Sequence, residues 1–479
     1  MTIWNPRYLA HVLAPDYHFA STHLKRHFVN ALTAHVRTVR RLGDPHIQRN
    51  QDAIGALEDK LITLHTWSTP PYDPEIPDLY FAINRELEAS LGSATVSFLR
   101  MGLSRNDLDM TVYKMRARDL LLELAQQART LQRVVLEQAE AHTKTVLIAH
   151  THHQPGQPTT LAHYLLAVSS GLSRNLDRLE EVYARLNTCP LGAAALAGSS
   201  HALDRYFTAR ALGFDRPVGN TYDAVAASDW QVDIVNVSQQ FSLTCSRFVC
   251  DLLGWASQDL FRLSDGLVQG SSIMPQKRNP VALEHARTRF SRALGASQMV
   301  IFSSHNIPFG DLNDFGPDIQ GALQALFLQL SGGLDLLAAS LETGTFDAAA
   351  LERLTSESDT MATELADELV REHDMAFQSA HHLVARLVTD LEGQGRVLKS
   401  ATPEDIVKLE GPRLKPDELN RALDPRAFIE RRNGIGGPAP EVVYDQLKHA
   451  RSTLDSHMTK FTEAAESLLH TEAALSRRS

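Results

Sequence analysis

The loop between two long apolar segments carries the densest group of chemically useful side chains in the sequence. It runs from Gly270 to Pro280 and reads Gly-Ser-Ser-Ile-Met-Pro-Gln-Lys-Arg-Asn-Pro. Lys277 and Asn279 can hold a carboxylate by charge and by hydrogen bond, and a nearby serine hydroxyl could act on the adjacent carbon if its proton were labile. The same residues also suit a plain turn with a helix cap, so both interpretations stay open.

A second polar cluster, Thr-His-His-Gln-Pro-Gly-Gln-Pro from Thr151 to Pro158, interrupts the longest apolar segment. Histidine moves protons near neutral pH, so His152 is a candidate acid, base or orienting group. His150, His152 and His153 are also close enough in sequence to suggest a metal, but a zinc site needs further ligands in a defined geometry. We therefore predict neither a metal nor a cofactor.

The third cluster, Ser104-Arg105-Asn106-Asp107, lies where the longest helix should begin. The free backbone N–H groups and the positive end of the helix dipole would face an anion there. Ser104 as an ordinary N-cap, with Asp107 completing the capping arrangement, explains the residues equally well.

Long helices must position these clusters, because apolar residues recur mostly three or four positions apart over most of the middle of the chain. The pattern predicts five long helices: Leu103–Gln154, Pro158–Asn187, Trp230–Leu263, Pro280–Ser304 and Asp318–Leu341. Their apolar stripes are too broad for surface helices of a monomer. We expect a bundle that continues into other subunits, and hence a homo-oligomer.

Shorter helical segments flank this bundle, and no segment alternates as a β-strand would. Before it we expect helices such as Thr22–Leu42 and Gln51–His65; after it, Ala349–Glu372 and Ala376–Glu392. The sequence thus predicts an all-α subunit with a central bundle of five long helices. Its three domains would be an N-terminal helical domain, the central bundle and a small C-terminal helical domain: residues 1–103, 104–345 and 346–479.

The overall composition narrows the class of protein. A formal charge of -10 argues against a nucleic-acid binder, which needs a basic face for phosphates. The start has no basic segment followed by an apolar core, and no stretch of about 18 apolar residues occurs, so we expect a cytoplasmic protein without membrane spans. Cys189, Cys245 and Cys250 are too few and scattered for a disulfide framework and should be buried free thiols.

Together, the clusters resemble a known family. The loop from Gly270 to Pro280 is similar to the signature loop of the fumarase and aspartase superfamily. Among the members of that superfamily, argininosuccinate lyase is the one that five other segments of the chain resemble: 104–107, 151–158, 220–225, 364–388 and 422–441. The resemblance covers nearly the whole chain, most weakly before about residue 100. It implies a homotetramer with a 20-helix core, active sites each drawn from three subunits, and elimination of fumarate from a small dicarboxylate substrate.

The resemblance also implies a role for each matching position. Ser271, the first of the two loop serines, matches the catalytic base, and Lys277 matches a group that binds and stabilises the substrate carboxylate. His152 matches the family's functional histidine and Glu284 the carboxylate that orients it, a pairing that fixes an imidazole tautomer. The other matching positions contact substrate: Ser104, Arg105, Asn106, Thr151 and Asn279.

Three substrate-contacting positions after the fourth long helix depart from the family pattern. Asp311, Gly316 and Ile319 stand where the family usually has a tyrosine, a glutamine and a lysine that touch the substrate. Losing a cation and two hydrogen-bonding side chains would change which leaving group fits. Argininosuccinate, cleaved to arginine and fumarate in arginine biosynthesis, is the default substrate, and another N-substituted aspartate, such as an aminopolycarboxylate, is the alternative.

Two further classes compete with this interpretation. A non-catalytic, crystallin-like relative is opposed by the presence of Ser271, Lys277 and His152. Another reaction of the superfamily, such as adenylosuccinate cleavage or cycloisomerisation of a carboxymuconate, is opposed by the cluster at 104–107 and by the C-terminal segment.

Overall fold

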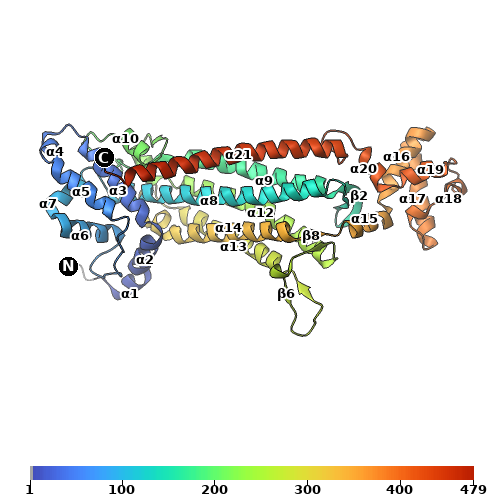
Figure 1. The fold of residues 1–479 in the computed structure, drawn as a ribbon, viewed down its shortest axis with the longest axis horizontal. Coiled ribbons are helices and arrows are strands. Elements are labelled where there is room, and N and C mark those ends of the chain that lie inside the picture. Colours follow the sequence, from blue (N-terminus) through green and yellow to red (C-terminus); the bar gives the residue numbers. More distant parts are fainter. Residues whose placement is uncertain (1–3, 479) are drawn as a thin grey trace.

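The computed structural model describes residues 4–478 as an elongated, almost wholly helical subunit (Figure 1). One end holds the N-terminal helices, the middle holds a long bundle, and the other end holds a compact group of short helices. The N-terminal elements are α1 Pro6–Tyr8, η1 Leu9–Leu13, α2 Ala14–His23, α3 Lys25–Arg40, α4 Pro45–Arg49, α5 Gln51–Thr63, α6 Leu79–Leu91, α7 Ser93–Val96 and η2 Ser97–Arg100. The predicted all-α class is confirmed.

The five predicted long helices are all present in the bundle. They are α8 Arg105–Ala141, α9 Leu161–Leu186, α12 Asp229–Ser257, α13 Val281–Ser304 and α14 Gln320–Thr343. Helix α8 packs against α9 and α14, α12 packs against α9 and α13, and α13 packs against α14. Their apolar stripes join in one continuous core, which includes Leu121, Phe241 and Phe290.

The predicted helix Leu103–Gln154 is too long. Helix α8 ends at Ala141, and an antiparallel hairpin of β1 Val146–Thr151 and β2 Gln154–Thr160 follows. β-Branched residues favour a strand in this segment, and Pro155 and Pro158 cannot continue a helix. The expectation that no segment forms a strand was therefore wrong here.

Short elements connect the long helices. Between α9 and α12 lie β3 Thr188–Cys189, α10 Arg205–Ala211, β4 Arg216–Pro217 and α11 Thr221–Ala226. Between α12 and α13 lie β5 Phe261–Arg262, η3 Asp265–Leu267, β6 Gln269–Gly270 and β7 Arg278–Asn279. Around α14 lie η4 Asn313–Phe315, η5 Pro317–Ile319 and β8 Thr345–Phe346.

The far end of the subunit has its own small core, which includes Leu365, Leu387 and Phe428. Buried Glu364 accepts hydrogen bonds from Arg371 and Arg431 beside it. The elements are α15 Ala348–Glu357, η6 Asp359–Met361, α16 Ala362–His373, α17 Phe377–Gly393, η7 Leu398–Ser400, α18 Pro403–Lys408, α19 Pro416–Ala422 and α20 Pro425–Glu430.

A sixth long helix, α21 Pro440–Leu475, was not predicted. It returns along the bundle and packs against α8 and α9, with Leu447, Leu454 and Phe461 in the main core (Figure 1). Its end lies beside the N-terminal helices, where Arg37 donates to the Ala474 carbonyl. The division into 1–103, 104–345 and 346–479 stays a proposal, with α21 covering the bundle.

The composition predicted no membrane span and three buried cysteines. Among residues 4–478, the helical stretch Asn313–Thr343 is long and apolar enough to suit a membrane span, although half of its most apolar window is buried within the subunit. Cys189 and Cys245 are buried free thiols as expected, but Cys250 is exposed. It lies on the outer side of α12, so the prediction that it is buried was wrong.

Candidate active site

The start of α8 is a capped helix end with a buried carboxylate beneath it. The Ser104 hydroxyl accepts from the Asn106 N–H, and the Asp107 carboxylate accepts from the Ser104 N–H at 3.0 Å. The other Asp107 oxygen accepts from the N–H groups of Gly192 and Ala194, at 2.8 and 3.0 Å. Burial raises the pKa of Asp107 to about 7, although these donors lower it. The capping interpretation is confirmed, and it fixes the positions of Ser104 and Asn106.

Arg105 is held by carboxylates of its own chain. Its guanidinium forms ion pairs with Asp78 and, at 2.8 Å, with Asp109. It also lies over the ring of Tyr80, 5.1 Å from the centroid. Burial lowers the pKa of Arg105, but Asp109 and Asp78 outweigh this and leave it raised. Its contact with substrate stays a prediction, and its role within the subunit is to fix the two aspartates.

The second cluster forms the turn of the β1–β2 hairpin. Thr151 pairs with Gln154, and the two residues between them, His152 and His153, have φ angles of 52° and 62°. Two left-handed residues at a two-residue turn define a type I′ hairpin, a conformation that non-glycine residues adopt at some cost. Such strain is concentrated at functional sites. The turn presents exposed His152 to the outside of the subunit.

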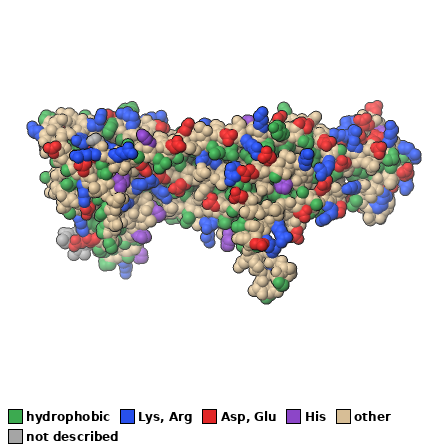
Figure 2. All heavy atoms as spheres, viewed as in Figure 1, with side chains coloured by type: hydrophobic (Ala, Val, Ile, Leu, Met, Phe, Trp, Pro, Cys, Tyr) green, Lys and Arg blue, Asp and Glu red, His purple; other side chains and the backbone are tan. Residues whose placement is uncertain are grey.

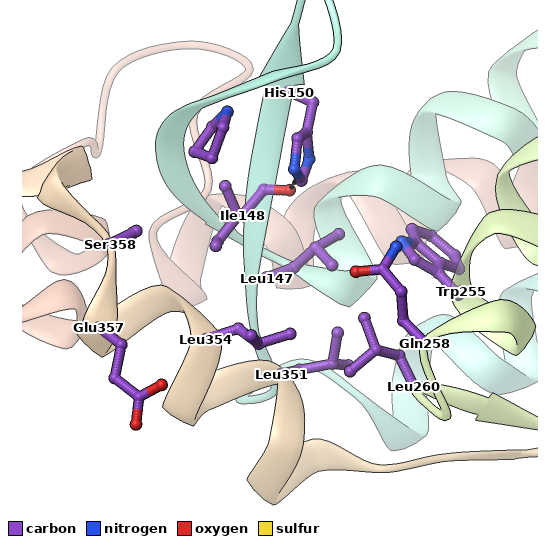
Figure 3. A pocket seen from close by; sticks show the side chains of 11 residues that line it. Leu147, Ile148, His150, Trp255, Gln258, Leu260, Leu351, Leu354, Glu357 and Ser358 are labelled. Atoms are coloured by element: carbon purple, nitrogen blue, oxygen red, sulfur yellow. Dashed lines mark hydrogen bonds between the residues drawn. The ribbon is translucent and has the colours of Figure 1, made fainter.

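Behind this hairpin lies a cavity of about 290 Å³ (Figure 3). Leu147 and Ile148 of β1 face Leu351 and Leu354 of α15 across it, and Trp255 of α12 closes one side. None of the predicted site residues lines this cavity. We therefore do not assign this cavity to the predicted site.

The signature loop projects from the bundle between β6 and β7 (Figures 1 and 2). At its start, the Ser271 Oγ accepts from the N–H groups of Ile273 and Met274, at 3.3 and 3.1 Å. Donors aimed at an oxygen stabilise its deprotonated form, which suits a base. Ile273 is 82% exposed at the tip, and Lys277 is exposed as well. The loop therefore holds Lys277 in solvent and Ser271 half-buried at its start.

The base of the loop is firmly tied to the subunit. Asn279 and Gln269 are partners in the β6–β7 ladder, and Arg278 pairs with Asp265 and donates to the Leu263 carbonyl at 2.9 Å. Glu284 follows, exposed in the first turn of α13. The two strands at the foot of the loop are thus held in place, and the continuously exposed segment begins at Ser272.

The subunit does not bring the three clusters together. Helix α8 has 37 residues, so it spans about 55 Å at 1.5 Å per residue. Ser104 lies at one end of it, and the hairpin with Thr151 and His152 follows the other end (Figure 1). Across the described chain, no hydrogen bond or ion pair joins His152 to Glu284. One subunit therefore does not bring the predicted site residues together.

The three positions that depart from the family pattern lie near the start of α8. Asp311 is exposed, and its charge acts on Arg105 and Asp109. The Ile319 side chain is fully buried, so it cannot replace an exposed cation. A Cβ added at Gly316 would lie 3.1 Å from the Leu312 carbonyl oxygen, a distance that leaves little room for a larger residue. The cation and the amide expected in the family are therefore both missing here.

Sequence reasoning missed a cavity of about 240 Å³ at this end of the bundle. Asp16, Asp78 and Asp109 line it, together with Arg105 and Tyr113. Arg105, Asp109 and Tyr113 are four residues apart on one face of α8, a signal that the sequence did offer. Asp16 and Asp78 come from other parts of the fold and left no such signal. No group of three or more His, Cys, Asp or Glu in residues 4–478 is arranged to hold a metal ion.

Comparison with known proteins decides the family. The family described as Lyase matches residues 19–295, and the one described as Argininosuccinate lyase C-terminal matches residues 359–430. Argininosuccinate lyase 2 of Agrobacterium fabrum is 33% identical over 462 residues, covering 94% of this chain and 91% of that protein. The chain belongs to the argininosuccinate lyase family. The resemblance inferred from the motifs is confirmed.

A second argininosuccinate lyase and a solved structure of another lyase are also similar to this member of the argininosuccinate lyase family. Argininosuccinate lyase of Methanoculleus marisnigri is 35% identical over 426 residues, covering 86% of this chain and 85% of that protein. EDDS lyase in complex with formate has the same fold, with a TM-score of 0.84 and 26% identity, over 99% of this chain and 95% of that one. The protein is therefore a carbon–nitrogen lyase that releases fumarate from an N-substituted aspartate.

Proposed function

We propose that four copies of this chain form a tetramer in which each active site draws on three subunits, with argininosuccinate as the default substrate. The observation that carries the proposal is the separation of the clusters in one subunit. Binding groups lie at the start of α8, and the catalytic groups lie on the hairpin and on the projecting loop. Only neighbouring copies can supply the missing partners, and we expect the assembly to act in the cytoplasm.

Exposed apolar side chains on the bundle support assembly. Leu243 of α12, Met299 and Phe302 of α13, and Leu328 of α14 are large, apolar and exposed, with Phe302 at 71%. Helix α21 covers α8 and α9 and leaves the outer sides of these three helices open. Extended apolar surface of this kind marks a subunit interface.

In the proposed reaction, Ser271 removes a proton from the carbon beside one substrate carboxylate. The two N–H donors at its Oγ favour the alkoxide that this step requires. Negative charge then spreads onto the carboxylate, where Lys277 and Asn279 stabilise it. One well-placed donor of this type contributes about 3 kcal/mol to the transition state.

The second step breaks the carbon–nitrogen bond. The bonding electrons leave with the nitrogen, which is protonated, and the remaining four-carbon unit is fumarate. His152, oriented by Glu284 of a neighbouring copy, is placed to manage proton transfer, with Thr151 beside it on the hairpin. Ser104 and Asn106, fixed by the cap of α8, hold the substrate at the opposite side.

The identity of the leaving group is a separate question. Argininosuccinate is the default because relatives at 33% and 35% identity are argininosuccinate lyases. Asp311, Gly316 and Ile319 favour the alternative, another N-substituted aspartate, because they remove a cation and an amide from the substrate region. An EDDS lyase variant with bound fumarate shares the fold at a TM-score of 0.84.

Fumarate release, followed by ultraviolet absorbance, tests the proposal. The purified tetramer is offered argininosuccinate and, separately, N-alkyl aspartates whose amines carry no guanidinium group. Release from argininosuccinate supports the default substrate. Release from the others alone supports a changed leaving group, and no release from any N-substituted aspartate contradicts the proposed reaction.

A further inference from the structure

The cavity at the start of α8 has an excess of negative charge. Asp16, Asp78 and Asp109 line it, whereas Arg105 is the one cation among its described lining residues. Asp78 and Asp109 are both engaged by Arg105. Asp16 makes no hydrogen bond or ion pair with the described residues, so one carboxylate faces the cavity uncompensated.

A buried hydroxyl faces the same space. Tyr113 is 5% exposed and lines the cavity, and its Oη has no hydrogen-bond partner in residues 4–478. The charges of Asp109, Arg105, Asp16 and Asp78 all act on it, which places the hydroxyl among them. A hydroxyl that opens into a cavity can donate to or accept from a ligand atom there.

The remaining walls are apolar and largely aromatic. Trp4, Tyr8, Phe19 and Phe28 line the cavity. Aromatic faces attract cations, and aromatic and aliphatic walls exclude water from an alkyl chain. The carboxylates in residues 4–478 are not grouped for a metal ion, so the chemistry of the lining favours an organic cation.

Nearby carboxylates extend the same field. Burial, with the like charges of Asp318 and Asp78, raises the pKa of Asp16 to about 6. Burial also raises the pKa of Asp311 and of Asp318. Arg105 opposes the shift of Asp311, and a ligand ammonium in the cavity would oppose that of Asp16.

We infer that this cavity binds the leaving group as an alkylammonium, and that the preferred leaving group carries no carboxylate at its far end. Of the two substrates in the proposed function, this selects another N-substituted aspartate over argininosuccinate, because arginine carries a carboxylate. The inference rests on the proposed function, because it takes the cavity as an extension of the substrate site beside Ser104. Released alkylamines are protonated at neutral pH. Asp16 would hold the ammonium, Tyr113 would bond to it or to its neighbour, and the aromatic rings would contact the alkyl chain.

Calorimetry on the tetramer tests this binding with three probes of similar length: butylamine, 1,4-diaminobutane and 4-aminobutanoate. Both amines should bind, and 4-aminobutanoate should bind at least about tenfold more weakly because its carboxylate meets three others. Asp16→Asn should lower the affinity for butylamine about tenfold, and Tyr113→Phe should lower this affinity by a smaller factor. Asp52→Asn, which removes the same charge on the exposed side of α5, is the matched control and should change nothing.

Equal binding of butylamine and 4-aminobutanoate would overturn the inference. So would unchanged butylamine binding in Asp16→Asn and Tyr113→Phe variants that keep the wild-type circular dichroism and tetramer. Fumarate release without amine binding would remove this inference and leave the proposed function standing. Amine binding that depends on Asp16, with no fumarate from any N-substituted aspartate, would remove the proposed function and leave a cation site.

Discussion

The two ends of the catalytic machinery are built in opposite ways. At the start of α8, Ser104 and Asn106 are fixed by a capping box, and buried Asp107 ties them to the backbone of the segment after α9. On the loop and the hairpin, Lys277 and His152 are exposed, and half-buried Ser271 is bonded only to the backbone of its own loop. The predicted binding groups are thus organised within the subunit, whereas the predicted catalytic groups would gain their surroundings only in the proposed tetramer.

The largest effect should come from the exposed end. Ser271→Ala removes the base and should lower the rate of fumarate release by about 10³-fold, the range of a lost general base. Helical content and the tetramer should not change, because the loop contributes no side chain to the core. The neighbouring Ser272→Ala is the control and should keep most activity; equal losses in both variants would contradict the role of Ser271.

Substitutions at the start of α8 should instead lower the stability of the protein. Asp107→Ala leaves the N–H groups of Ser104, Gly192 and Ala194 without their acceptor, which should cost about 3 kcal/mol in the free energy of unfolding. Urea denaturation of variant and wild type measures this. Asp204→Ala removes an ordinary cap and should cost about 1 kcal/mol. Equal costs would show that Asp107 is only a cap.

The affinity of the acidic cavity for butylamine should depend on pH. Asp16 lines the cavity together with Asp78, Arg105, Asp109 and Tyr113. Burial, with the charges of Asp318 and Asp78, raises the pKa of Asp16 to about 6. Above this pH the carboxylate is charged and attracts an ammonium; as pH falls through about 6 it is protonated, and butylamine affinity should fall up to about tenfold.

Calorimetry from pH 5 to pH 8 measures this change. In the Asp16→Asn variant the profile should be flatter, because the titrating group is gone. A wild-type affinity that is constant over this range would exclude Asp16 as the binding group.

The smallest effect concerns the hairpin. His153→Gly removes the cost of a left-handed non-glycine residue but adds chain entropy to the unfolded state, so stability should rise by only about 0.5 kcal/mol. A thermal melt compares the two proteins. A loss of stability would mean that the imidazole makes stabilising contacts in the assembled protein.

The bundle helices and the reactive segments could be predicted from the sequence because both depend on local sequence patterns. Apolar periodicity located five bundle helices, and the signature loop and the cluster at Ser104 marked reactive segments. The hairpin was missed because no Gly or Pro separates it from α8, so the apolar pattern continues as far as Ile148. Helix α21 did leave a signal, since Val443, Leu447, Leu454 and Phe461 recur at helical spacing.

The acidic cavity could not be predicted in the same way. Asp16, Asp78 and Tyr113 meet only through the packing of the N-terminal helices on α8, which no local pattern specifies. The distance between Ser104 and His152 could not be predicted either, because it depends on where α8 ends and on the direction in which it runs.

Complementation between inactive variants tests the central claim most directly. Ser271→Ala and His152→Asn tetramers, each inactive alone, are mixed, dissociated and reassembled, and fumarate release from an N-substituted aspartate is measured. If sites combine residues of different subunits, hybrid tetramers contain some sites with both native residues, and part of the activity returns. If hybrids form and remain inactive, each subunit must hold its own Ser271 and His152 in one site, and the account is wrong.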